Sequence, residues 1–167
     1  MHQFISVLPP IWGMICTRFR VMIIVVYYGR HRGCKTVRNV VLSISDGELA
    51  GAIGRTLQDA GQFKVYRSYA STLRELLTTC KIMRAELLLM DVKDKPGLTV
   101  PERLAAVEAV RGQLPSCRMV FFCEEPHEGV PSELVREVQH ARDTYQIDAY
   151  IYTSMPPGYA ASLLESL

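Results

Sequence analysis

From about residue 38 onward, apolar residues follow two alternating patterns along this chain. Short apolar runs are typical of strands buried on both faces of a sheet. Between these runs, apolar residues recur at intervals of three and four, which is typical of amphipathic helices. The stretches that predict strands are Val40–Ile44, Phe63–Tyr66, Leu87–Met90, Met119–Cys123 and Ala149–Tyr152.

A stretch with helical spacing follows each predicted strand. Gly61 is placed to end the first helix, because glycine favours the conformation found just after a helix. Pro101 opens the third helix and Pro115 is expected to stop it. The predicted helices carry their apolar positions within Leu49–Ala60, Leu73–Cys80, Pro101–Leu114, Pro131–Ala141 and Pro157–Leu167.

This order of elements predicts an α/β fold. Strands separated by helices require a parallel sheet with right-handed crossovers. The helices must cover both faces of the sheet, because the strands are apolar throughout. We therefore expect a doubly wound, five-stranded parallel sheet of order 2-1-3-4-5, whose site lies where the strand order reverses, between the first and third strands.

Carboxylates leave the two strands that flank this reversal point. Asp46 follows the first strand and Asp91 follows the third, at the abrupt end of Leu87–Met90. We expect Asp91 at the rim of the sheet, exposed and pre-positioned, although an ordinary turn residue is the alternative. Two converging carboxylates would form a cluster of hard oxygen ligands suited to Mg²⁺.

With Ser45 and Asp46 after the first strand and Asp91 after the third, residues 38–167 resemble the receiver domain of a response regulator, a flavodoxin-like fold. The resemblance implies that Asp91 is the phospho-acceptor of a two-component system. It also implies that Asp46 is one of two acids that hold Mg²⁺, with Ser45 in place of the other. The backbone carbonyl of Lys93 would complete the metal site.

Other positions depart from the pattern of these receivers. Cys123 stands where they have Thr or Ser, and a thiol is only a weak hydrogen-bond donor. Thr153 stands where they have a Lys, so an ammonium that would pair with phosphate is lost. Tyr150 matches the aromatic switch position. The resemblance is thus strong in layout and partly degenerate in its signature residues.

The expected function is that of a stand-alone receiver rather than an enzyme, in phosphorelay signal transduction. It would take a phosphoryl group on Asp91 with Mg²⁺ from a histidine kinase or phosphotransfer protein, and act on a downstream protein. A degenerate receiver that binds a protein partner without phosphorylation is the second hypothesis. A small enzyme or flavin carrier is the third, but Gly47, Gly51 and Gly54 do not have the GxGxxG spacing.

Composition is that of an ordinary globular domain and excludes several other classes. The 167 residues are 49% hydrophobic and 22% charged, with a net charge of +2, which gives no reason to expect nucleic-acid binding. The five cysteines are odd in number and contain no CxxC motif, so we expect free thiols in the cytoplasm. Homodimerisation stays open.

Residues 1–37 are expected to be an N-terminal extension, poorly ordered or a non-native start. The apolar stretches 5–16 and 21–28 are each too short to span a bilayer. No secretory signal pattern is present, because the N-terminus lacks a basic region and a cleavage site. We therefore expect no membrane association, with a surface anchor through residues 1–28 as the alternative.

Overall fold

The computed structural model describes residues 37–126 and 132–167. These residues belong to one compact unit, residues 34–167. The expectations for the N-terminal extension and for Pro131 as a helix start lie outside the described residues. Within those residues, no helix is long and apolar enough to cross a membrane.

The sheet is the predicted one, with five parallel strands in the order β2-β1-β3-β4-β5. The central strand β3 is buried along its whole length. It pairs with β1 on one side and β4 on the other, so that Leu88 is level with Val41 and Met119. The strands are β1 Arg38–Ser43, β2 Phe63–Arg67, β3 Leu87–Asp91, β4 Arg118–Cys123 and β5 Ala149–Tyr152.

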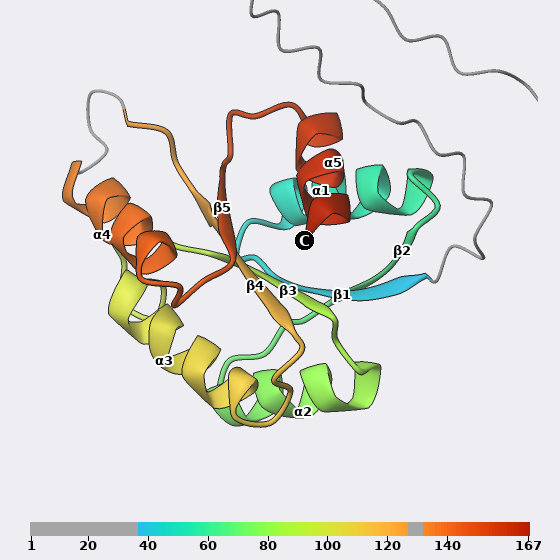
Figure 1. The fold of residues 1–167 in the computed structure, drawn as a ribbon, viewed down its shortest axis with the longest axis horizontal. Coiled ribbons are helices and arrows are strands. Elements are labelled where there is room, and N and C mark those ends of the chain that lie inside the picture. The colour runs from blue at the N-terminus through green and yellow to red at the C-terminus, as the bar shows by residue number, and fades with distance from the viewer. Residues whose placement is uncertain (1–36, 127–131) are drawn as a thin grey trace, which may run out of the picture. The chain divides into compact units, whose positions relative to one another are not determined.

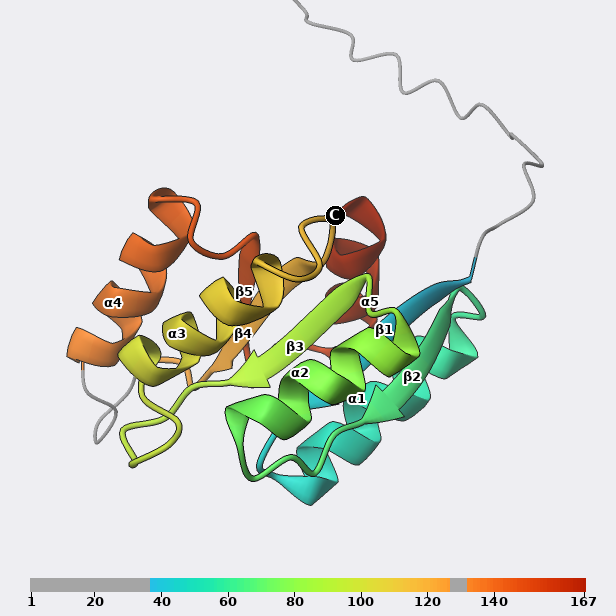
Figure 2. The ribbon, with the colours of Figure 1, turned by 90° about the horizontal axis from the view of Figure 1, so that it is seen from below.

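Helices cover both faces of this sheet, as Figures 1 and 2 show. Helices α1 and α5 pack on one face through residues such as Ile53 and Leu164. Helices α2, α3 and α4 pack on the other, through residues such as Leu76, Val107 and Val138. The helices are α1 Gly47–Asp59, α2 Leu73–Met83, α3 Val100–Arg111, α4 Ser132–Asp143 and α5 Pro157–Ser166.

Consecutive strand residues feed the two cores in turn, because side chains alternate across a sheet. In β3, Leu87 and Leu89 join the core under α1 and α5, while Leu88 and Met90 join the core under α2, α3 and α4. Both faces of the strand are therefore committed to packing. This fixes the register that delivers Asp91 to the carboxyl end of the sheet.

Most predicted boundaries hold to within a few residues, and one is wrong. Gly61, with φ of 71°, follows the end of α1 as expected. Helix α3, however, ends at Arg111 and not at Pro115. Gly112 has a low helix propensity, and the residue before a proline avoids helical geometry, so the chain leaves the helix early. Leu114 reaches the core from the following turn.

Candidate functional site

Asp91 is the last residue of β3, and its side chain is almost completely buried. Only 1% of the residue is exposed, so the expectation of an exposed carboxylate at the rim of the sheet was wrong. The strand does end at the edge of the sheet, but neighbouring side chains cover the carboxylate there. A buried carboxylate has to be paired and hydrogen-bonded, and its partners define the site.

Both oxygens of the Asp91 carboxylate are engaged. Oδ2 accepts hydrogen bonds from the Ser45 backbone N–H at 2.9 Å and from the Ser45 hydroxyl. Oδ1 accepts from the Arg103 guanidinium Nη2 at 2.9 Å. The Lys93 ammonium lies 3.8 Å from Oδ2. Such charge-assisted contacts are shorter and stronger than neutral hydrogen bonds, so the carboxylate is firmly held.

Arg103 comes from the first turns of α3. Thr99 caps this helix and forms a capping box with Glu102, which fixes the first turn beside the sheet edge. The Arg103 side chain is 12% exposed. Its Nε donates to the backbone carbonyl of Asp91 at 3.0 Å, and its Nη2 also approaches the Ser43 carbonyl at 3.5 Å. One guanidinium therefore links α3 to the ends of β1 and β3.

Sequence reasoning missed both cations of this site. Arg103 shares the spacing of Val100, Val107 and Val110, which are all buried, so it is a charge at a core position of the helix. That was the available signal, because a charge on an inward face implies a buried partner. Lys93 was predicted to act through its backbone carbonyl. Its ammonium contacts Asp91, and its carbonyl accepts from the Lys95 N–H at 2.8 Å. The role of that carbonyl in a metal site stays a prediction.

Asp46 serves as the N-cap of α1. Its Oδ1 accepts from the backbone N–H groups of Leu49 at 3.1 Å and Glu48 at 2.9 Å. These hydrogen bonds hold the pKa of Asp46 below its usual range, and the positive charge of Lys93 lowers it slightly further. An N-cap carboxylate of this kind satisfies backbone donors that would otherwise lack partners. Its role as N-cap of α1 is thus sufficient to explain an aspartate at this position.

A small cavity of about 160 Å³ brings several predicted site residues together. Its lining includes Asp46, Asp91, Lys93 and Thr153. Glu124 lines it as well, rather than its neighbour Cys123. The order of parallel strands thus placed these side chains correctly at one edge of the sheet, from the ends of β1, β3, β4 and β5.

The donor set of this cavity does not fit Mg²⁺ as it stands. Ser45 stands where the resemblance predicts an acid, and the Asp91 oxygens accept hydrogen bonds from Ser45 and Arg103. The Lys93 ammonium occupies the approach to Oδ2. In residues 37–126 and 132–167, no group of three or more His, Cys, Asp or Glu side chains could hold a metal ion. Mg²⁺ is usually held through one or two carboxylates and several waters, and here the Asp91 oxygens are engaged by other side chains.

The remaining signature positions have ordinary structural surroundings. Cys123 is 1% exposed, and burial raises the pKa of its thiol to about 12, so it is neutral and unreactive. Its backbone carbonyl accepts from the Thr153 N–H at 2.9 Å. Tyr150 is half-buried and meets Tyr152 edge to face, with 5.5 Å between the ring centroids. Burial, and then the neighbouring Tyr150, raise the pKa of Tyr152.

The chain matches no family model, and no curated protein matches it by sequence. Its fold does match solved structures. A CheY-like protein from Pseudomonas aeruginosa PAO1 is 19% identical, with 77% of this chain and 98% of that chain covered and a TM-score of 0.59. The REC domain of AraT, a response regulator from Geobacillus stearothermophilus, is 17% identical, with 78% and 92% covered and a TM-score of 0.60.

A third solved structure is similar to the same extent. It is the response regulator TrrA from Thermotoga maritima in complex with Mg²⁺ and BeF, which is 13% identical, with 77% of this chain and 97% of that chain covered and a TM-score of 0.56. At such identities the likeness is one of fold. The five-stranded sheet, its strand order and these matches lead to one conclusion: the described part of the chain has the fold of a response-regulator receiver domain.

Proposed function

We propose that this chain is a receiver-like protein-interaction module that acts without phosphorylation of Asp91. The observation that carries this proposal is the engagement of both Asp91 oxygens by Ser45 and Arg103 in a residue that is 1% exposed. A carboxylate that attacks a phosphodonor has to reach it along the line of the breaking bond. Here the nucleophile would first have to leave its partners.

The charge balance of the site supports the same proposal. In a metal-dependent receiver, Mg²⁺ would offset the repulsion between the carboxylates and an anionic phosphodonor. In this chain two side-chain cations, those of Arg103 and Lys93, lie within 4 Å of the Asp91 carboxylate and offset its charge. Displacing a buried, hydrogen-bonded cation in favour of an incoming ion is costly. The site therefore favours a permanent structural pair over a transient phosphate.

Phosphoryl transfer to Asp91 with Mg²⁺ is the competing function. One observation favours it: Asp46, Asp91, Lys93 and Thr153 all line the cavity of about 160 Å³. In that case a histidine kinase or phosphotransfer protein would supply the phosphoryl group. The Lys93 ammonium would pair with it, in place of the Lys that Thr153 replaces.

One experiment separates these functions. The full chain is incubated with Mg²⁺ and acetyl phosphate, and separately with beryllofluoride, and followed by intact mass and by amide chemical shifts. We expect no phosphoryl adduct and no shifts around the cavity. A gain of one phosphoryl group that is lost in Asp91→Asn and kept in Asp94→Asn would overturn the proposal, because Asp94 is an exposed aspartate in the loop that follows β3.

The proposed module acts through a protein partner, and we place it in the cytoplasm. Cys80, Cys117 and Cys123 are buried free thiols, a state that suits a reducing compartment. Binding would be measured by affinity capture on the wild-type chain and on Asp91→Asn. A partner that binds both chains supports the module, whereas one that requires added phosphodonor supports the competing function.

A further inference from the structure

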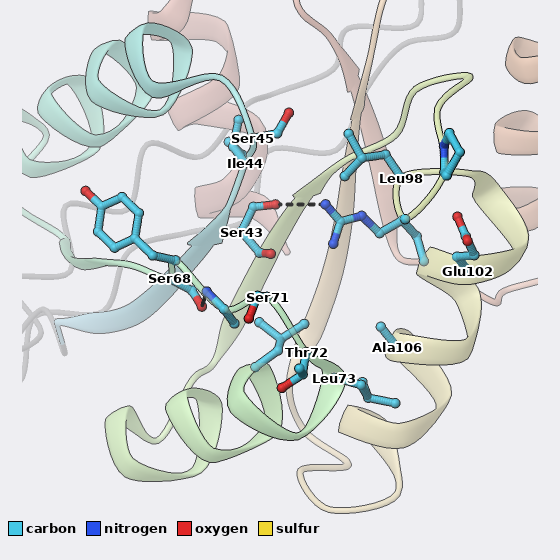
Figure 3. A pocket seen from close by; sticks show the side chains of 16 residues that line it. Ser43, Ile44, Ser45, Ser68, Ser71, Thr72, Leu73, Leu98, Glu102 and Ala106 are labelled. Carbon is cyan, nitrogen blue, oxygen red and sulfur yellow. Dashed lines mark hydrogen bonds between the residues drawn. The ribbon is translucent and has the colours of Figure 1, made fainter.

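A second and larger cavity lies next to the Asp91 site. It has a volume of about 480 Å³ and opens between the end of β1, the segment joining β2 to α2, and the start of α3 (Figure 3). It shares no lining residue with the small cavity that contains Asp46 and Asp91. Its volume lies in the range of pockets that bind small molecules, roughly 300–1,000 Å³.

Arg103 connects this cavity with the buried carboxylate. It lines the cavity, and the dashed line in Figure 3 marks its contact with the Ser43 carbonyl. Its Nε and Nη2 atoms donate to Asp91 and Ser43. Its Nη1 has no hydrogen-bond partner among the described residues. A guanidinium carries five N–H donors in a fixed plane, so two of them remain for a ligand.

The rest of the lining includes both hydroxyl-bearing and apolar side chains. Figure 3 shows the side chains of Ser43, Ser71 and Thr72 at the cavity, together with those of Leu73 and Leu98. Hydroxyls can donate to an anionic group or accept from a polar one, and the apolar side chains can cover a small hydrocarbon body.

An acidic side chain also faces this cavity and limits what can bind there. Glu102 is exposed, and its Oε2 accepts hydrogen bonds from the Thr99 N–H and hydroxyl. These contacts hold the pKa of Glu102 below its usual range, so the carboxylate is charged at neutral pH. A ligand with one oxyanion directed at Arg103 and a body that is otherwise uncharged or cationic avoids repulsion from Glu102.

We propose that this cavity binds a small organic molecule whose single oxyanion, a carboxylate or a phosphate, accepts a hydrogen bond from Arg103 Nη1. A planar guanidinium suits such an oxyanion because it offers directed, charge-assisted hydrogen bonds. The bound oxyanion would share Arg103 with Asp91, since both lie on the same guanidinium. Ligand binding would therefore change the strength of the Arg103–Asp91 interaction. The proposal does not depend on whether Asp91 is phosphorylated.

The test uses the full chain and three probes of similar size: benzoate, its uncharged amide benzamide, and phenyl phosphate. Binding is followed by amide chemical shifts up to about 10 mM of probe, because a weak site of this kind has a Kd in the millimolar range. We expect benzoate, phenyl phosphate or both to shift residues that line the cavity, and benzamide to shift none. The acid that binds more tightly shows whether the site prefers a carboxylate or a phosphate.

Two variants locate the site. Arg103→Lys keeps the charge but loses the planar donors, and we expect it to weaken acid binding roughly tenfold. Ala106→Met keeps Arg103 and fills the cavity that Ala106 lines, so it should abolish binding in a folded protein. Arg136→Lys, on the exposed surface of α4, is the matched control and should bind like the wild type.

Several results would overturn the proposal. These are no binding of either acid, equal binding of benzoate and benzamide, or unchanged binding in both Arg103→Lys and Ala106→Met.

Discussion

The Arg103–Asp91 pair gives the sharpest prediction about this fold. We consider a double-mutant cycle made of Arg103→Met, Asp91→Asn and the double variant. Methionine keeps most of the apolar stem of Arg103 and removes its charge, and asparagine keeps the shape of Asp91. If the pair is a structural element, each single change should lower the free energy of unfolding, and the two effects should not add.

The magnitude follows from burial and from the contacts that remain. The two side chains are 12% and 1% exposed, so removal of either leaves an opposite charge inside the protein. Breaking a buried pair in this way costs roughly 3–5 kcal/mol. Because Ser45 and Lys93 still contact Asp91 after Arg103→Met, we expect the lower end, about 3 kcal/mol. The double variant should recover about 2 kcal/mol of the summed loss, which is a typical coupling for directly contacting groups.

Urea unfolding followed by far-ultraviolet circular dichroism measures these quantities. A fold of this size has a total stability of roughly 5–15 kcal/mol, so the single variants should remain folded in the absence of urea. Arg142→Met is the matched control, because Arg142 pairs with Asp143 on the surface, where the side chains are 59% and 65% exposed. It should change stability by less than about 0.5 kcal/mol. Single losses below about 1 kcal/mol that simply add would refute the structural role of the pair.

Three further predictions concern the same edge of the sheet. Mg²⁺ should leave the melting temperature of the wild type unchanged and should raise that of the Lys93→Met/Arg103→Met variant. The reason is that removal of both cations leaves carboxylates whose charge a metal ion can neutralise. A shift in the melting temperature of the wild type would contradict this. The folded-state pKa of Asp46 is lowered, so its contribution to stability is present above the usual carboxyl pKa and is lost as the pH falls through the folded-state pKa. Asp46→Asn should therefore weaken the loss of stability at acidic pH when the free energy of unfolding is measured against pH. Cys123→Ser should lower the free energy of unfolding by about 1–2 kcal/mol in urea titrations, because it places a hydroxyl in an apolar core; a stabilising effect would show that a partner is available there.

The fold could be predicted because its signals are local. Apolar runs such as Leu87–Met90 and the helical spacing around Ile53 are set by the chain itself, and the alternation of strands and helices leaves few topologies. Convergence of Asp46, Asp91 and Thr153 on one cavity follows from the same topology, because parallel strands end at a common edge.

The burial and charge pairing of Asp91 could not be predicted in this way. Its burial depends on which long side chains from other elements reach it, and neither Arg103 nor the Lys93 ammonium is tied to it by sequence spacing. Family resemblance suggested a metal-binding role for Lys93 through its backbone and gave no role to Arg103. A charge at the inward position of α3 was the one local sign that a buried anion needed a partner.

The same pair restricts how such a chain can diverge. Loss of Arg103 alone leaves the buried Asp91 carboxylate with only part of its compensating charge, and loss of Asp91 alone removes the anion that Arg103 pairs with. Either single substitution is therefore expected to lower stability. Selection for foldedness should therefore retain or discard the two together. Among orthologues, positions 91 and 103 should covary, with neither charge retained in the absence of the other.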